Sequence, residues 1–139
     1  MLALHGTAGS ASENESAAAR DCGARLQAIS AQDARLAQIE RMYRRHLRFS
    51  GTAHRLIPHF HAEHEDIVRA RQELTEADIP FVVYRVMKSE KTDGPLQVAV
   101  GVLKLFGNGA LPCIDAAIAS GITPGAALLN QVRSSIQLQ

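Results

Sequence analysis

Arg85 is the residue whose surroundings most suggest ligand chemistry, because it interrupts the apolar run that begins at Phe81. If this run forms a strand, alternation of side chains places Arg85 on the same face as Phe81 and Met87. A cation on an apolar face needs a partner. The guanidinium either pairs with an internal Asp or Glu, or binds a ligand carboxylate through two hydrogen bonds.

Three further side chains are candidates for contact with such a ligand. Gln72 alternates onto one face with Leu74, where its amide bonds either a ligand or a neighbouring strand residue. Arg71 falls on the opposite face and becomes a candidate only if a bulge switches that face. Thr123 precedes an expected helix, so it is either a plain N-cap or part of an anion-binding helix terminus.

A cluster of histidines precedes these candidates. His54, His59, His61 and His64 fall close together, and Glu65 follows. The His-x-His pair resembles part of a metal-binding cupin motif, but the glycine spacing differs and the second cupin motif is missing. We therefore expect no metal, and a solvated, pH-sensitive surface is the favoured interpretation.

Composition excludes several function classes. The 139 residues carry a formal net charge of +1, whereas a protein that coats a nucleic acid has a clear basic excess. No apolar run approaches the roughly 18 residues of a membrane span, and no secretory signal is visible. Cys22 and Cys113 are too few for a disulfide framework and lack metal-ligand spacing, so we expect both to be inert. A cytoplasmic protein without nucleic-acid or membrane partners is predicted.

The elements that must position these residues follow from periodicity and turn signals. Residues 1–14 are predicted to be a disordered tail, and residues 15–139 a single domain. Residues 15–48 have helical spacing, with a second helix start at Ser30 or Asp33. A last helical part comprises Leu111–Ser120, with Pro112 in its first turn and Gly121 at its end, and a short helix capped by Thr123.

Between these helical parts the apolar runs favour strands. Three strands are expected, the last two joined through the turn that contains Asp93 and Pro95: Glu65–Leu74, Phe81–Glu90 and Leu96–Phe106. Helices followed by an antiparallel sheet indicate an α+β fold with helices on one side of the sheet. An open sheet edge also predicts a homodimer.

Three stretches occur in a characteristic order. Gly51 and Thr52 are followed by Glu65 and Gln72; Arg85 is followed by the Asp93–Gly94–Pro95 turn; and Leu111–Pro112 is followed by Thr123–Pro124. Together they resemble the chorismate pyruvate-lyase (4-hydroxybenzoate synthetase-like) family, in the superfamily that also contains UTRA-like sensor domains. The resemblance covers roughly Met42 to Leu129 and depends on the order and spacing of the stretches.

The resemblance implies a lyase that converts chorismate to 4-hydroxybenzoate and pyruvate without any cofactor. Arg85 would anchor a carboxylate, Gln72 would orient the substrate and Thr123 would assist at the pocket rim. Arg71 would be a further substrate-binding candidate if a bulge turned it to the same face. The family's late strand with a substrate-polarising Glu has no counterpart before Gln139. The expected alternatives are therefore a truncated enzyme, a non-catalytic domain that binds a small aromatic acid, and a protein whose long N-terminal helix docks on a partner.

Overall fold

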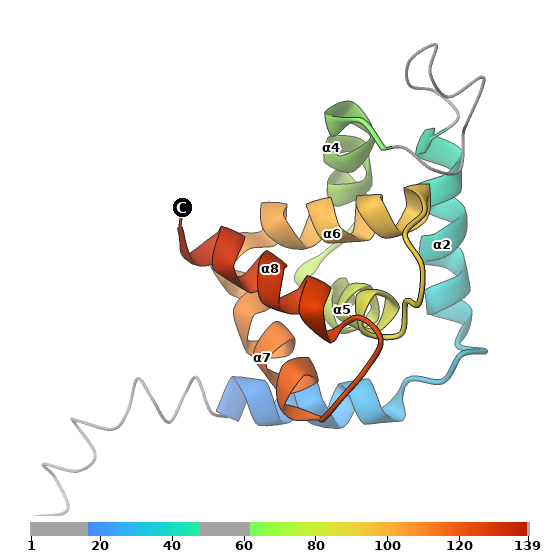
Figure 1. Cartoon of the computed structure of the whole chain (residues 1–139). Helices are drawn as coiled ribbons and strands as arrows, with labels where there is room; N and C mark the ends of the chain where they lie inside the picture. The colour runs from blue at the N-terminus through green and yellow to red at the C-terminus, as the bar shows by residue number, and fades with distance from the viewer. Residues whose placement is uncertain (1–16, 48–61, 139) are drawn as a thin grey trace, which may run out of the picture.

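The computed structural model describes residues 17–47 and 62–138, and every regular element in these ranges is helical (Figure 1). A first helix covers residues 17–28 and is called the N-terminal helix below. The others are α2 (Ala34–Leu47), α4 (His64–Gln72), α5 (Ile79–Met87), α6 (Gly94–Phe106), α7 (Leu111–Ala119) and α8 (Ala126–Gln137), with short 3₁₀ turns at Glu76–Asp78 and Gly107–Ala110. The predicted α+β fold is wrong, because the described residues contain no strand. The predicted tail, residues 1–14, lies outside the described ranges.

The run predicted as the strand Phe81–Glu90 belongs to α5. Pro80 occupies the first turn of this helix, where its missing N–H costs nothing. Three valines suggested a strand, yet the buried positions follow helical spacing: Ile79, Val82, Val83, Val86 and Met87. A short run that is apolar at nearly every position fits either period, and packing on several sides selects the helix.

The predicted strand Leu96–Phe106 is likewise part of α6. Asp93, assigned to a hairpin turn, is the N-cap of this helix, and its side chain accepts a hydrogen bond from the Leu96 N–H at 2.9 Å. Pro95 lies in the first turn. The same Asp-Gly-Pro sequence that favours a turn therefore starts a helix here.

The predicted strand Glu65–Leu74 is replaced by α4 and the residues after it. Asp66 is fully buried, and its carboxylate accepts a hydrogen bond from the Glu63 N–H at 2.9 Å, which satisfies a backbone donor at the helix start. Ala70 is buried one turn later, facing the rest of the protein. With all three strands absent, the sheet edge that motivated the homodimer is absent from the described residues as well.

The helical predictions agree better with the structure. Helical structure is interrupted between the N-terminal helix and α2, near Ser30 and Asp33. The Asp33 carboxylate accepts a hydrogen bond from the Arg35 N–H at 2.9 Å. The helix predicted for Leu111–Ser120 is confirmed as α7, with Pro112 in its first turn. Gly121 follows with a φ of 124°, a conformation that favours glycine.

The helices α5 and α6 are central in the fold. In Figure 1 α5 is seen end-on near the centre, α6 crosses above it, and the N-terminal helix runs below. α5 packs against α2, α6, α7 and α8, and α6 also packs against α4. The stretch Gly94–Ala119 is long and apolar enough to cross a membrane, a property that core helices of soluble proteins share. Here Gly107, with a φ of 65°, divides it into α6 and α7.

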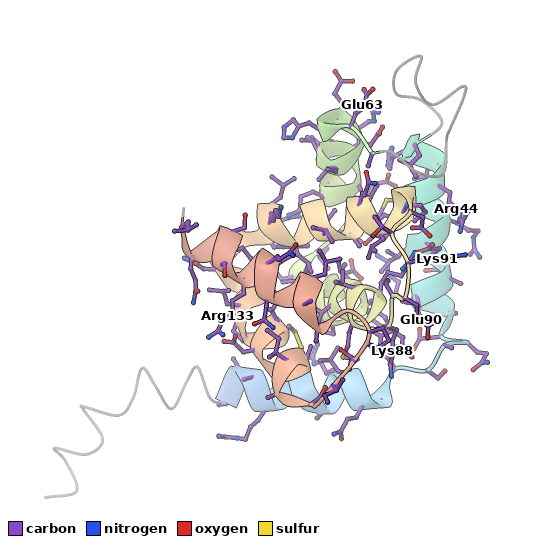
Figure 2. The ribbon with its side chains drawn as sticks, viewed as in Figure 1. Arg44, Glu63, Lys88, Glu90, Lys91 and Arg133 are labelled. Carbon is purple, nitrogen blue, oxygen red and sulfur yellow. A yellow bond between two sulfur atoms is a disulfide. The ribbon has the colours of Figure 1, made fainter. Side chains whose placement is uncertain are left out.

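A disulfide between Cys22 and Cys113 joins the N-terminal helix to α7 (yellow bond in Figure 2). The two Cα atoms are 5.3 Å apart although 91 positions separate them in the sequence. The expectation of two inert, unpaired cysteines is therefore corrected. Spacing in the sequence carried no sign of the pair, because only the packing of two helices brings the residues together.

Gly125 is required by a close approach of backbones. The Gly125 N–H donates a hydrogen bond to the Met87 carbonyl at 3.0 Å, which fixes the start of α8 on the end of α5. A Cβ atom at Gly125 would lie 1.9 Å from the Val86 carbonyl oxygen, and a main-chain atom cannot move aside as a side chain can.

We therefore expect Gly125→Ala to lower the free energy of unfolding by about 2 kcal/mol or more, within the range of overpacked cores. The measurement is chemical denaturation of the variant and the parent. Gly109→Ala is the matched control, because a Cβ there would meet no atom within 4 Å, and it should change stability by less than about 0.5 kcal/mol. Equal stability of the two variants would contradict the close approach.

The Arg35–Asp78 pair joins α2 to the start of α5. Arg35 donates two hydrogen bonds, both of 2.9 Å, to the Asp78 carboxylate, and the Thr75 N–H donates a third. Burial opposes ionisation of Asp78, but the hydrogen bonds from Arg35 and Thr75 outweigh it and hold its pKa below the ordinary value.

Because the folded-state pKa of Asp78 is lowered, its contribution to stability is present above its ordinary pKa of about 3.9 and is lost as the pH falls through the folded-state value. We expect the free energy of unfolding to decline below about pH 4, and Asp78→Asn to flatten that decline. Denaturation between pH 2 and pH 7 measures both. Asp21→Asn, which removes a carboxylate that is 69% exposed, should leave the slope unchanged.

Candidate functional site

A groove of about 720 Å³ lies between the N-terminal helix, α5 and α7. Its volume falls in the range of small-molecule sites. The floor is largely apolar and includes Leu26, Met87 and Ala116, with Tyr84 providing an aromatic face. We call it the helix groove. Four other cavities in the described part of the chain are smaller, at about 330 to 430 Å³.

The charges that line the helix groove are two cations and one acid. Arg20 comes from the N-terminal helix, and Lys88, which Figure 2 labels, follows the end of α5. Neither is ion-paired with a carboxylate among residues 17–47 and 62–138. The acid, Asp115, is paired with Arg133 at 3.0 Å. The groove thus has a net positive lining over an apolar floor.

The Thr123 hydroxyl and the Lys88 ammonium group also line the groove. The Thr123 Oγ1 atom is buried and has no hydrogen-bond partner among the described residues. Thr123 was predicted to cap the last helix, but α8 begins at Ala126 with Gly125 as its N-cap, so that prediction is wrong. Lys88 lies over the Tyr84 ring, with Nζ 5.7 Å from the ring centroid. An anion with an apolar body would find both cations and an aromatic surface here.

Arg85 lies beside the helix groove but its charge is already compensated. It donates hydrogen bonds to Glu40 at 3.0 Å and 3.3 Å and to Asp93 at 3.3 Å, and it also bonds Ser89. A smaller cavity of about 390 Å³ adjoins Arg85 and shares Tyr84 and Lys88 with the helix groove. The partner anticipated for Arg85 is therefore internal.

The surroundings of Arg85 and of the nearby Tyr43 raise the pKa values of these two side chains. Burial alone would lower the pKa of Arg85, but the hydrogen bonds and charge of Glu40, with Asp93, raise it instead. Tyr43 is fully buried below this network, and burial with the nearby Glu40 charge raises the pKa of its phenol well above the ordinary value. Both groups keep their ordinary protonation near neutral pH, which suits a structural ion-pair network.

Gln72 and Arg71 do not join Arg85. Gln72 is exposed at the end of α4. The Arg71 guanidinium lies 3.8 Å from the centroid of the Phe106 ring and donates a hydrogen bond to the Leu74 carbonyl. Neither residue lines the helix groove, so of the predicted substrate-binding residues it contains Thr123 alone.

The histidine cluster falls largely outside the described residues, since His54, His59 and His61 lie there. His64 is exposed at the start of α4. Among residues 17–47 and 62–138, no three His, Cys, Asp or Glu side chains are grouped so that they would hold a metal ion. His46 instead contacts Glu73, which Arg45 also binds at 2.6 Å and 2.8 Å.

The groove residues Tyr84 and Lys88 were missed because the run that contains them was interpreted as a strand. Tyr84 and Lys88 are four residues apart, and so are Asp115 and Ala119, which places each pair on one helix face. Interpreted as a strand, the run around Arg85 put Tyr84 and Lys88 on the face opposite Arg85, where they attracted no attention. Helical spacing was the available signal.

Arg85 connects α2, α5 and the N-cap of α6, so we expect Arg85→Met to lower the free energy of unfolding by about 1–3 kcal/mol, because two half-buried carboxylates lose their partner. The control is Arg44→Met, which removes a guanidinium that binds the same Glu40 at 3.5 Å but is 49% exposed. Chemical denaturation should show less than about 0.5 kcal/mol for that variant. An Arg85→Met protein as stable as Arg44→Met would contradict the structural role.

Comparison of the chain with family models, with curated proteins and with solved structures found no match. The resemblance to the chorismate pyruvate-lyase family therefore stays a prediction from the sequence.

Proposed function

We propose that this protein binds a small carboxylate with an apolar, aromatic body in the helix groove, without turning it over. The observation that supports this is the pairing of an apolar floor with two cations, Arg20 and Lys88, that have no carboxylate partner in the described part of the chain. A carboxylate would receive charge-assisted hydrogen bonds from these groups, while its ring would lie against Tyr84 and Met87.

Binding is favoured over catalysis because two reactive side chains of the groove, Ser120 and Asp115, are already engaged. The Ser120 hydroxyl donates a hydrogen bond to the Ala117 carbonyl at 2.6 Å, and Asp115 is paired with Arg133. No nucleophile in the groove therefore has a base beside it, as covalent catalysis requires. The lyase activity implied by the resemblance stays a prediction, and Arg85, its anchoring residue, is held by Glu40 and Asp93.

The partner-docking alternative has less support. The large apolar side chains exposed among the described residues are Leu105, Ile122 and Leu138. None of them lies on the N-terminal helix or on α2, where an exposed apolar stripe was expected to mark a docking surface. A small molecule in the groove therefore accounts for more of the observed chemistry than a protein partner does. The cytoplasmic location and the exclusion of nucleic acid and membrane stay predictions from composition.

The test is calorimetric titration of the full chain with 4-hydroxybenzoate, using neutral 4-hydroxybenzyl alcohol for comparison. We expect the acid to bind and the alcohol to bind at least about tenfold more weakly, because only the acid carries a charge for Arg20 and Lys88. Lys88→Ala should weaken binding of the acid by about tenfold. Lys91→Ala, which removes an exposed charge that lines none of the cavities described above, should leave the affinity unchanged.

Two results would overturn this function. The first is acid and alcohol binding with equal affinity, or no binding of the acid at millimolar concentration. The second is release of 4-hydroxybenzoate and pyruvate when the protein is mixed with chorismate, which would support the lyase instead. A loss of affinity in Lys91→Ala equal to that in Lys88→Ala would show that overall charge, and not the groove, attracts the acid.

A further inference from the structure

The N-terminal helix has few attachments to the rest of the protein. Of its residues, only Cys22 and Leu26 are buried, with 4% and 6% of their surface exposed. The ion pair between Arg25 and Asp21 is internal to the helix and exposed. Among the described residues, no hydrogen bond or ion pair joins it to another helix, so the disulfide to Cys113 and the side chain of Leu26 hold it in place.

The intrinsic stability of this helix is low. Its described part, residues 17–28, is about three turns long, and isolated helices of this length are marginal in water. Gly23 in its interior lowers its helix propensity further. A segment of this kind keeps its position only through tertiary contacts, and the covalent one is the strongest it has.

The same helix forms one wall of the helix groove. Ala19, Arg20, Gly23, Leu26 and Gln27 line the groove from this side, facing α5 and α7 across it. Displacement of the helix would therefore remove one of the two groove cations together with part of the apolar floor. A concave site at this position therefore requires the N-terminal helix to stay in place.

A path to the disulfide exists on the opposite side of the helix. A separate cavity of about 370 Å³ is lined by both cysteines, with Asp21, Arg25 and Glu76 among its charged residues. Both cysteines are buried, and they line a cavity whose lining shares no residue with the helix groove. A small thiol could reach them without entering the ligand site.

We propose that the Cys22–Cys113 disulfide is a redox-sensitive tether that controls the helix groove; this rests on the proposed function of that groove. A dithiol is the reductant. One of its thiolates attacks a sulfur of the disulfide, forms a mixed disulfide and releases the other cysteine, which takes up a proton. The second thiol of the reductant then displaces the remaining cysteine. Two electrons and two protons pass to Cys22 and Cys113, and the reductant leaves as its own disulfide.

The predicted location agrees with a regulatory role. Disulfides are rare in the cytoplasm, and those that occur there are usually transient, catalytic or redox-sensing. In a cytoplasmic protein with this pair, the thiol state of the cell would therefore decide whether the groove keeps the wall that the N-terminal helix forms. Reduction would release the N-terminal helix, while α5 and α6 would keep their packing, because neither contains a cysteine.

The test is amide hydrogen exchange of the full chain, oxidised and reduced with dithiothreitol, together with titration by 4-hydroxybenzoate. We expect exchange in residues 17–28 to accelerate by about 100-fold on reduction, while α6 keeps its protection. The affinity for 4-hydroxybenzoate should fall by at least about tenfold. A Cys22→Ser/Cys113→Ser variant should match the reduced protein and should not respond to dithiothreitol.

Three results would overturn the tether: unchanged exchange in residues 17–28, loss of protection in α6 as well, or equal affinity of the two forms for 4-hydroxybenzoate. The second would mean that the disulfide supports the whole fold. Hydrogen exchange requires no ligand, so it tests release of the helix independently of binding. If 4-hydroxybenzoate binds neither form while the helix is released, the proposed function fails and with it the control of a ligand site.

Discussion

Burial of aliphatic side chains between α5 and its neighbours is the constraint on which the rest of the structure depends. Val82, Val83 and Val86 of α5, and Val98 and Val102 of α6, are fully buried. Small aliphatic side chains leave gaps unless the helix axes come close, so the backbones must approach one another. Glycine permits this where the approach is tightest.

Two glycines mark the closest contacts. A Cβ at Gly101 of α6 would lie 2.5 Å from the Ile67 side chain of α4, and one at Gly125 would meet the main chain of α5. The second contact also carries the hydrogen bond from Gly125 to Met87. The start of α8, and with it the Thr123 edge of the helix groove, is therefore positioned by close packing onto α5.

The half-buried charges follow the same geometry. Arg35 binds Asp78, and Arg85 binds Glu40 and Asp93, so ion pairs link α2 and α5 to each other and to the N-cap of α6. In each case a charge that has lost water gains a partner of opposite sign. Arg20 and Lys88 differ, because both are exposed to solvent at the helix groove and neither is paired with a described carboxylate.

The sequence by itself determined where several of the helices begin and end. The break near Asp33, Pro112 in the first turn of α7 and Gly121 beyond its end are properties of single residues and their immediate neighbours, and they were predicted from those residues. Only the tertiary structure decided whether the apolar runs form strands or helices. An apolar run of seven residues with several valines fits a strand or a buried helix until packing selects one. The tertiary structure also decided the pairing of Cys22 with Cys113, the internal partners of Arg85 and the position of Lys88 across from Arg20, because each depends on residues far apart in the chain.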